Sequence, residues 1–273
     1  MLKFISFGSG SSGNCYFLYT ENDGLIIDCG IGIRALKKGM FNYGLQMSQI
    51  KHILITHDHA DHVKSVSSLA TFCKCSVYGT ELVHDGILHN WCVRKKLDPS
   101  QKRYVEKDSE MQIGEFLIKP FSVSHDSIDN VGYEIKVGDS TFVIVTDCGS
   151  VTDVVKEHIR NANYLVIEAN YDPEMLLEGP YPEHLKARIA SDRGHMSNQD
   201  CGITLAENAT PNLRHVWLCH LSEENNHPEL AKKTVESILR SYGLIPGKDF
   251  QLDVLKRLTP TGVFELQAPT TCL

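Results

Sequence analysis

The stretch Ile53-Leu-Ile-Thr-His57-Asp-His59-Ala-Asp61-His62 (ILITHDHADH, residues 53–62) decides the fold of this chain. It begins as an apolar run, which is typical of a buried strand, and continues with three histidines and two aspartates within six positions. Neutral imidazole and carboxylate groups suit zinc, manganese or iron. A lone histidine is usually packed or solvated, but this spacing predicts a metal site. In a tight turn, His57 and His59 point to one side while Asp61 and His62 point to the other, an arrangement that serves two metal ions.

One segment does not complete two coordination spheres, so further ligands are expected at the ends of other strands. His125, Asp147 and His220 each follow an apolar run directly. Loops at strand ends carry chemistry on a rigid scaffold, although each of these residues is weak evidence alone. Asp28 ends an early strand in the same way. Its carboxylate is expected either to bind metal or to hold a histidine ligand in one tautomer.

The order of elements predicts an α/β fold with two sheets and helices outside them. The sequence up to residue 56 is mostly typical of strands and turns. The whole sequence contains no repeat, low-complexity tract or linker that would divide the chain into domains. We therefore expect a single domain over residues 1–273, with a short C-terminal tail at about 267–273. The periodicity then predicts helices over 60–72, 81–89, 152–160, 183–191, 197–208 and 228–241, and strands over 77–79, 110–113, 116–119, 132–137, 140–145, 164–167, 215–218 and near 262–266.

Composition narrows the class of protein. The 273 residues are 42% hydrophobic and carry a net charge of −7, which argues against a surface coated with nucleic-acid-binding charge but leaves room for a local basic patch. No run of eighteen apolar residues and no export signal is found, so no membrane partner is expected. Nine scattered cysteines indicate a reducing compartment, and we expect a cytoplasmic protein. Nothing in the composition predicts the oligomeric state.

The segment Gly8-Ser-Gly-Ser-Ser-Gly13 matches a dinucleotide-binding fingerprint, but the context is wrong. That fingerprint needs a following helix, whereas an aromatic-rich strand and a turn follow here. We expect instead a bent loop between two strands at the rim of the metal site. A tight β-connection without further function is an equally good interpretation. If the loop binds phosphate, its hydroxyl, amide and backbone N–H donors come from Ser9, Ser11, Ser12 and Asn14.

The chain resembles the metallo-β-lactamase fold hydrolases over nearly its whole length, from Phe4 to about Leu266. The resemblance rests on the ordered set His57-x-His59-x-Asp61-His62, His125, Asp147 and His220, with Asp28 upstream. The resemblance implies an αββα sandwich of two packed mixed sheets with outer helices. It also implies two divalent metal ions per chain, of which Zn²⁺ suits the ligands best and Mn²⁺ is the alternative. By the resemblance, one metal is bound by His57, His59 and His125, the other by Asp61, His62 and His220, and Asp147 bridges them together with a hydroxide.

A second resemblance concerns the catalytic acid. Residues 168–170, 192–198 and 220–222 are similar to three elements of tRNase Z-type nucleases. This implies that His195 protonates the leaving oxygen and that Glu168 orients it, with Asp61 also in the catalytic set. Such a pairing is chemically sensible because a leaving alkoxide needs a proton. The alternative is that His195 caps the helix beginning at Ser197 and that Glu168 is an ordinary strand-end residue.

A third resemblance narrows the branch. Residues 7–15, 168–172 and 179–188 closely resemble the YycJ-like (also called WalJ) branch of bacterial metallo-β-lactamase fold proteins. That branch is associated with exonuclease action on DNA from 5′ ends. The long insertion with which tRNase Z grips tRNA has no counterpart here. Three cations around His195 are candidates for phosphate contacts, although such residues are more often plain surface: Lys186, Arg188 and Arg193.

The sequence therefore predicts a dinuclear phosphodiesterase, a 5′-to-3′ DNA exonuclease in which the bridging hydroxide attacks phosphorus and His195 protonates the leaving group. DNA is favoured over RNA as the substrate. Three alternatives stay open. They are hydrolysis of a small ester, thioester or lactone at the same metal site, tRNase Z-like RNA processing, and a binding protein without catalytic activity.

Overall fold

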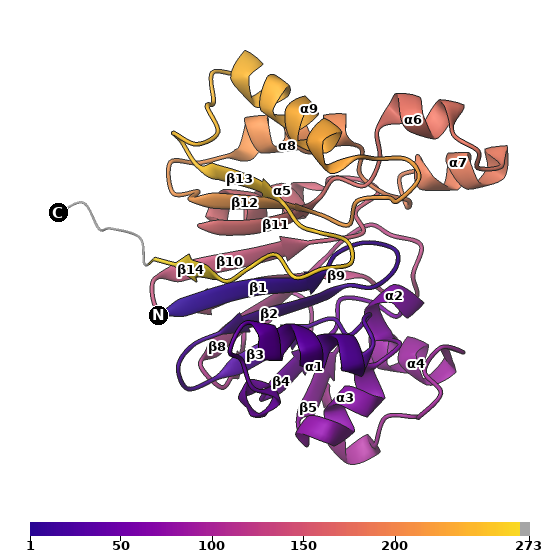
Figure 1. Cartoon of the computed structure of the whole chain (residues 1–273), viewed down its shortest axis with the longest axis vertical. Coiled ribbons are helices and arrows are strands. Elements are labelled where there is room, and N and C mark those ends of the chain that lie inside the picture. Colours follow the sequence, from indigo (N-terminus) through magenta and orange to yellow (C-terminus); the bar gives the residue numbers. More distant parts are fainter. Residues whose placement is uncertain (268–273) are drawn as a thin grey trace. The chain divides into compact units, whose positions relative to one another are not determined.

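The computed structural model describes residues 1–267 and contains two compact units (Figure 1). Unit 1 comprises Met1–Pro120, Ser127–Asn130 and residues 256–267, and unit 2 comprises Phe121–Asp126 and Val131–Leu255. The prediction of one domain over the whole chain stays a prediction. Of the tail expected at about 267–273, residues 268–273 lie outside the described part of the chain.

Unit 1 holds a mixed seven-stranded sheet in the order β14-β1-β2-β3-β4-β5-β6. Neighbouring strands are antiparallel from β14 to β3 and parallel from β3 to β6. The strands are β1 Leu2–Gly8, β2 Cys15–Tyr19, β3 Gly24–Ile27, β4 His52–Leu54, β5 Ser76–Gly79, β6 Lys102–Tyr104 and β14 Phe264–Leu266, and the helices are α1 Ile33–Asn42, α2 Ala60–Val63, α3 Val66–Cys73 and α4 Glu81–His89. Two short 3₁₀ turns, η1 Met47–Gln49 and η2 Pro99–Gln101, complete the unit.

The helices of unit 1 cover one face of this sheet. Alternate strand residues such as Ile26 and Ile53 form a buried cluster with Leu36 of α1, Leu69 of α3 and Ile87 of α4. The strand residues that point to the opposite face are buried as well. Strands buried on both faces read as continuous apolar runs, and this explains why β3 and β4 were recognisable from the sequence.

The single helix predicted over residues 60–72 is wrong. The structure has two helices there, α2 and α3, because the chain turns at Ser65, where φ is −111° and ψ is 1°. The backbone of Cys29 causes the break. The N–H of Cys29 donates to the carbonyl of His62, and the carbonyl of Cys29 accepts from the N–H of Ser65. The Ser65 N–H is therefore not used for a hydrogen bond within a helix. Hydrophobic periodicity does not report such a long-range backbone contact.

The second sheet has the order β13-β12-β11-β10-β9-β8-β7. It is parallel from β13 to β10 and antiparallel between β10 and β9 and between β8 and β7. Its strands are β7 Met111–Ile113, β8 Phe116–Ser122, β9 Val131–Val137, β10 Ser140–Val145, β11 Tyr164–Glu168, β12 His215–Cys219 and β13 Gln251–Val254, and the helices of unit 2 are α5 Asp153–Asn161, α6 Pro173–Glu178, α7 Glu183–Ile189, α8 Asn198–Asn208 and α9 Pro228–Ser241.

Helices α5, α8 and α9 pack on one face of β10, β11 and β12, with α8 and α9 side by side (Figure 1). The three parallel strands end at the same edge of the sheet, as βα units require. The structure confirms the predicted helices in this unit to within a few residues. The sequence missed α1, α6, β6 and β13. Among residues 1–267, no helix has the length and apolar character needed to cross a membrane.

A buried ion pair lies within unit 2. The carboxylate of Glu134 on β9 accepts hydrogen bonds from His158 Nδ1 at 2.7 Å and from Asn161 Nδ2 at 3.2 Å, and Lys136 Nζ lies 3.2 Å away. Burial by itself raises the pKa of Glu134, but these partners outweigh burial and lower its pKa from 4.5 to about 2. The carboxylate form therefore stabilises the folded chain.

We expect Glu134→Gln to lower the free energy of unfolding at pH 7 by about 3 kcal/mol, at about 1.4 kcal/mol per pKa unit. Because the pKa of Glu134 is depressed in the folded state, this contribution is complete above about pH 5 and disappears as the pH falls toward 2. Urea unfolding between pH 3 and pH 7 measures it, with the exposed neighbour Glu157→Gln as the matched control. A difference between wild type and variant that does not shrink with acid contradicts this account.

Candidate metal centre

The cluster predicted in unit 1 is built around Asp28, directly after β3. Its carboxylate is fully buried and accepts from His62 Nδ1 at 2.7 Å, from the Thr56 N–H at 2.9 Å and from the Thr56 hydroxyl. The proton of His62 is therefore on Nδ1, and Nε2 is the ring nitrogen that faces Asn14 and Asp61, at 2.9 and 3.4 Å. Asp28 thus has the contacts expected of a group that fixes a histidine tautomer. His57 follows β4 and is fully buried, and its Nδ1 lies 3.0 Å from the Thr56 hydroxyl.

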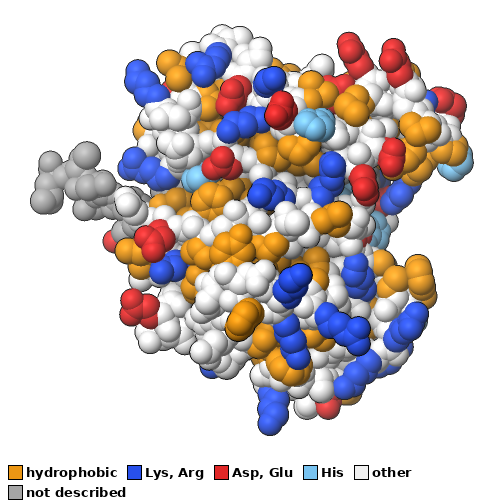
Figure 2. All heavy atoms as spheres, in the orientation of Figure 1, with side chains coloured by type: hydrophobic (Ala, Val, Ile, Leu, Met, Phe, Trp, Pro, Cys, Tyr) orange, Lys and Arg blue, Asp and Glu red, His pale blue; other side chains and the backbone are white. Residues whose placement is uncertain are grey.

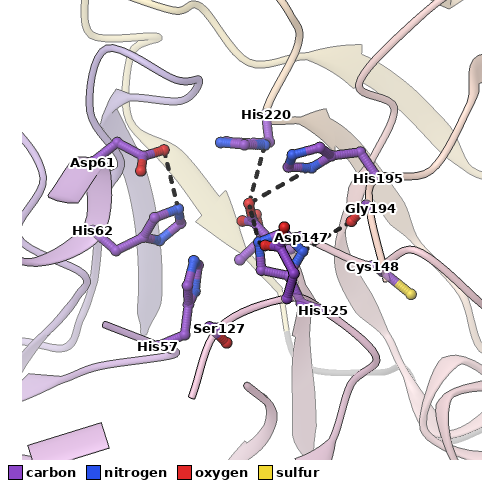
Figure 3. Close-up of polar contacts among 12 residues, drawn as sticks. His57, Asp61, His62, His125, Ser127, Asp147, Cys148, Gly194, His195 and His220 are labelled. Atoms are coloured by element: carbon purple, nitrogen blue, oxygen red, sulfur yellow. Dashed lines mark hydrogen bonds and ion pairs between the residues drawn. The ribbon is translucent and has the colours of Figure 1, made fainter. Parts of the chain in front are cut away.

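His59 and Asp61 complete the unit 1 cluster. His59 is the N-cap of α2, and Asp61 and His62 lie in its first turn. Asp61 Oδ2 lies 3.4 Å from His62 Nε2, a pair shown in Figure 3. A neutral imidazole nitrogen beside a carboxylate oxygen is a donor set that suits zinc or manganese.

The glycine-rich loop supports this cluster through its backbone. A side chain at Gly13 would lie 2.4 Å from the carbonyl of Gly30, and one at Gly30 would overlap the carbonyl of Asp61 at 1.5 Å. Asn14 donates its backbone N–H to that same carbonyl at 2.7 Å. The loop joins β1 to the antiparallel strand β2, as the sequence predicted. The glycines permit this close approach, and the strand that follows them excludes a dinucleotide-binding strand–helix unit.

The four loop residues predicted to bind phosphate fall into two groups. Ser11 and Ser12 are exposed. Ser9 is fully buried, with its hydroxyl 2.9 Å from that of Tyr16. Asn14 is also fully buried, and its side-chain amide contacts His62 Nε2 at 2.9 Å and Asp61 Oδ2 at 3.2 Å. These contacts place Asn14 against the candidate metal ligands.

The substitution Asp28→Asn is expected to weaken metal binding by about 10- to 100-fold, as removal of a ligand's hydrogen-bond partner does in other sites. The introduced amide would offer N–H groups where His62 and Thr56 already donate, and this favours the His62 tautomer with its proton on Nε2. Competition against a chromophoric chelator measures the affinity directly. Asp85→Asn, on the exposed side of α4, is the matched control. Unchanged affinity with lowered stability would restrict Asp28 to a structural role.

The cluster in unit 2 gathers four side chains whose ligand atoms lie within 4.8 Å of one another, namely Asp147, Glu168, His195 and His220. Asp147 follows β10, Glu168 ends β11 and His220 follows β12, so three of the four stand at one edge of the parallel sheet. Asp147 and His220 have left-handed backbones, with φ of 52° and 54°, as Asp28 does with φ of 61°. Backbone strain of this kind clusters at functional sites.

Glu168 is the centre of this cluster. Its Oε1 accepts from His195 Nδ1 at 2.7 Å and from His220 Nδ1 at 2.9 Å. Its Oε2 accepts from the backbone N–H groups of Cys148 at 2.8 Å and Met196 at 3.0 Å. The carboxylate is fully buried, and every one of these four partners donates. Both imidazoles therefore carry a proton on Nδ1 and donate it to the same carboxylate oxygen.

The charges in the cluster shift the pKa values of Glu168 and His195 in opposite directions. Burial raises the pKa of Glu168, but the neighbouring imidazoles of His195 and His220 outweigh it and hold the pKa well below its usual range. Burial likewise lowers the pKa of His195, but the carboxylates of Glu168 and Asp147 outweigh it and raise the pKa. The alternative that His195 caps α8 is not what the structure shows, because the Ser197 hydroxyl caps that helix.

His125 and the three cations predicted to contact phosphate all have hydrogen-bond partners within unit 2. His125 Nδ1 donates to the carbonyl of Gly194 at 2.8 Å, and its Nε2 lies 3.4 Å from Asp126 Oδ1 and 3.7 Å from Asp147 Oδ1. Arg193 donates from two guanidinium nitrogens to the carbonyl of His125, both at 3.2 Å. Arg188 pairs with Asp126, and Lys186 donates to the carbonyl of Leu177 at 2.6 Å and to Glu183 at 3.1 Å. All three predicted phosphate contacts thus have protein partners.

A cavity of about 320 Å³ opens beside His195 within unit 2. The residues that line it come from several segments of unit 2 and include Tyr171, Asp192 and Asp200. The side chain of Cys148 is fully buried in the hydrophobic core, as expected for a packed residue next to Asp147. His195 is therefore the member of the cluster that borders open space.

The donor groups in each unit suit a divalent metal. In unit 1, His62 donates from Nδ1 to Asp28, and its Nε2 lies beside the carboxylate of Asp61. In unit 2, His125 and His220 donate from Nδ1 to oxygen acceptors, and the carboxylate of Asp147 is among the candidate ligands. Each unit thus offers imidazole nitrogen together with carboxylate oxygen, a combination typical of zinc and manganese sites.

Sequence reasoning missed two residues that contact these ligands. Thr56 contacts both Asp28 and His57, and Asn170 donates to the carbonyl of His220 at 2.7 Å and lies 3.2 Å from its Nδ1. Thr56 precedes the histidine motif directly, and Asn170 closes the segment 168–170 quoted for its resemblance. Their positions beside the quoted segments were a signal, but threonine and asparagine are common at strand ends and in turns and do not by themselves indicate a metal site.

Comparison with known proteins gives a consistent result. Residues 24–220 match the family model of the beta-lactamase superfamily domain. The chain is 32% identical to exodeoxyribonuclease YycJ of Bacillus anthracis, covering 96% of this chain and 98% of that one. It is 34% identical to exodeoxyribonuclease WalJ of Streptococcus pneumoniae serotype 2, covering 92% and 93%.

A solved structure agrees on the fold. The metallo-β-lactamase fold protein YhfI of Bacillus subtilis matches with a TM-score of 0.69 at 17% identity, covering 96% of this chain and 99% of that one. The predicted fold class and the predicted resemblance are both confirmed. The chain belongs to the metallo-β-lactamase superfamily and, within it, to the YycJ-like branch.

Proposed function

We propose that this protein is a metal-dependent phosphodiesterase that degrades DNA from its 5′ ends. Membership of the family makes it a metal-dependent hydrolase. The observation that carries the proposal is the carboxylate of Glu168, which binds His195 and His220 through the same oxygen. His220 is thereby held in place as a candidate ligand. His195, which borders a cavity, is held in place as a candidate acid.

We propose the ligands that the family resemblance implies. His57, His59 and His125 would bind one ion and Asp61, His62 and His220 the other, with Asp147 shared. Two ions are proposed, with Zn²⁺ favoured by the histidines and Mn²⁺ as the alternative. When bound, such ions supply a nucleophile at neutral pH and neutralise charge on the reacting phosphate.

The protein residues then position and protonate. His195 donates a proton to the leaving oxygen, and Glu168 holds its ring at Nδ1 so that Nε2 is the donating nitrogen. Asp28 and Asn170 hold His62 and His220 in place. The relatives named as exodeoxyribonucleases favour DNA over RNA as the substrate. All eight cysteines among residues 1–267 are free thiols, which supports a reducing, cytoplasmic location.

The test uses metal-depleted protein reloaded with Zn²⁺ or Mn²⁺ and offered linear duplex DNA labelled at one end. Two substrates carry a 5′-phosphate or a 5′-hydroxyl, and His59→Ala controls for contaminating nuclease. We expect stepwise shortening from the 5′ end by the parent protein alone. If DNA and RNA both stay intact with either metal while a thioester or lactone is cleaved, the nuclease assignment is wrong. Selective cleavage of a tRNA precursor would favour RNA processing.

A further inference from the structure

The segment of residues 90–98 in unit 1, between α4 and η2, has an unusual surface. Trp91 is 86% exposed, whereas the other tryptophan, Trp217, is fully buried. The segment is not loosely attached, because Val93 and Leu97 are buried in the core of unit 1. Between these two anchors, the consecutive cations Arg94, Lys95 and Lys96 are all exposed. A fixed loop thus presents an indole and three positive charges to solvent.

Two side chains of this loop are hydrogen-bonded to different parts of unit 1. Asn90 Nδ2 donates to the carbonyl of Asp58 at 2.6 Å, and Asp58 lies between His57 and His59 in the histidine motif. Lys95 Nζ donates to the Thr71 hydroxyl on α3 at 3.1 Å. The loop therefore runs from the histidine motif to the exposed side of α3.

A further cation, from α1, contacts α3. Lys37 of α1 places its Nζ 3.6 Å from the ring centroid of Phe72, the half-exposed residue after Thr71. Figure 2 shows lysine and arginine side chains gathered over the surface of unit 1 in the region of its helices. In a chain of net charge −7, three consecutive exposed cations that begin three residues after an exposed tryptophan are a local exception.

We infer that Trp91 and the cations Arg94, Lys95 and Lys96 form a binding platform for single-stranded DNA beside the histidine motif. Proteins that bind single strands combine cations that follow the backbone with aromatic side chains on which bases stack. An indole exposed on both faces suits an unstacked base, and it does not suit a paired one. This inference rests on the proposed function, and it assigns the site that holds the strand near the metal-binding residues.

The contrast between the two tryptophans supplies a direct test. Metal-loaded protein is titrated with oligo(dT) that carries nuclease-resistant phosphorothioate linkages, while tryptophan fluorescence and the anisotropy of a 3′ label are recorded together. A base stacking on Trp91 is expected to quench the exposed tryptophan, and the emission of buried Trp217 should persist. Trp91→Phe should retain binding and lose the quenching. Trp91→Ala should weaken binding about fivefold or more, which is the loss of at least about 1 kcal/mol per stacked base.

The charges are tested separately. Replacing Arg94, Lys95 and Lys96 together by serine should weaken binding and flatten its salt dependence, because each lost phosphate contact lowers the slope by about 0.7 for single strands. Tyr242→Ala, at the exposed C-cap of α9, is the matched control and should leave binding unchanged. Metal content and thermal unfolding verify that each variant is folded.

The outcomes separate this inference from the proposed function. Tight binding by anisotropy without quenching, or with equal affinity for Trp91→Ala, overturns the platform while the exonuclease assignment stands. Binding that depends on Trp91, with no hydrolysis of ordinary DNA under either metal, supports the platform and overturns the proposed function. Absence of any binding to oligo(dT) overturns the platform, and the hydrolysis assay then decides the function independently.

Discussion

Replacing His195 by alanine is expected to slow DNA hydrolysis by about 100- to 10,000-fold, the usual contribution of a positioned general acid. His195 borders a cavity, and its Nδ1 is 2.7 Å from Glu168. The loss should depend on the leaving group. A deoxyribose alkoxide needs a proton as it departs, whereas p-nitrophenolate departs without one. With a p-nitrophenyl phosphodiester as substrate, we therefore expect the effect of His195→Ala to fall below about tenfold.

Steady-state rates on both substrates, measured at equal metal content, give this ratio. His184→Ala, an exposed histidine on α7, is the matched control and should leave both rates unchanged. An equal loss on the two substrates would mean that His195 acts on metal binding or on the fold and is not the acid. Full activity of the variant on DNA would remove His195 from the mechanism.

Glu168→Gln is expected to lower both the stability of the fold and the rate of DNA hydrolysis. All four partners of the carboxylate donate, so an amide in its place brings N–H groups against N–H groups and leaves buried donors unsatisfied. We expect the free energy of unfolding to fall by about 3 kcal/mol, since breaking a buried charged network costs this order of energy. DNA hydrolysis should fall by at least about 100-fold, because His195 and His220 lose their common acceptor.

Urea unfolding and turnover measured on the same preparations separate the two effects. Glu178→Gln at the end of α6 is an exposed control in the same unit. If Glu168→Gln keeps its metal and its stability but loses turnover, the carboxylate serves His195 alone. If stability falls and turnover per folded molecule is unchanged, Glu168 is a structural residue and the catalytic interpretation fails.

Much of the fold was predictable because its strands are buried on both faces. Continuous apolar runs such as Tyr164–Glu168 and Ser140–Val145 are visible in a sequence without any alignment. In the structure, the side chains of Thr80 and Thr152 cap the starts of α4 and α5. The sequence missed α6 although Asp172 and Pro173 open it with a recognised signal. It also joined α2 to α3, because the contact that separates them comes from Cys29, more than thirty residues away.

The sequence by itself determined the superfamily and the chemical types of the candidate ligands. A motif such as His57-x-His59-x-Asp61-His62 is local, and its side chains identify metal chemistry wherever the chain places them. Only the tertiary structure decided which groups hold those ligands. Asp28 holds His62, Glu168 holds both His195 and His220, and the glycines at 13 and 30 are needed for backbone contacts near Asp61. These contacts join residues that are distant in the sequence. The packing of strand ends decides which residues meet, and such contacts leave no periodic or local signal along the chain.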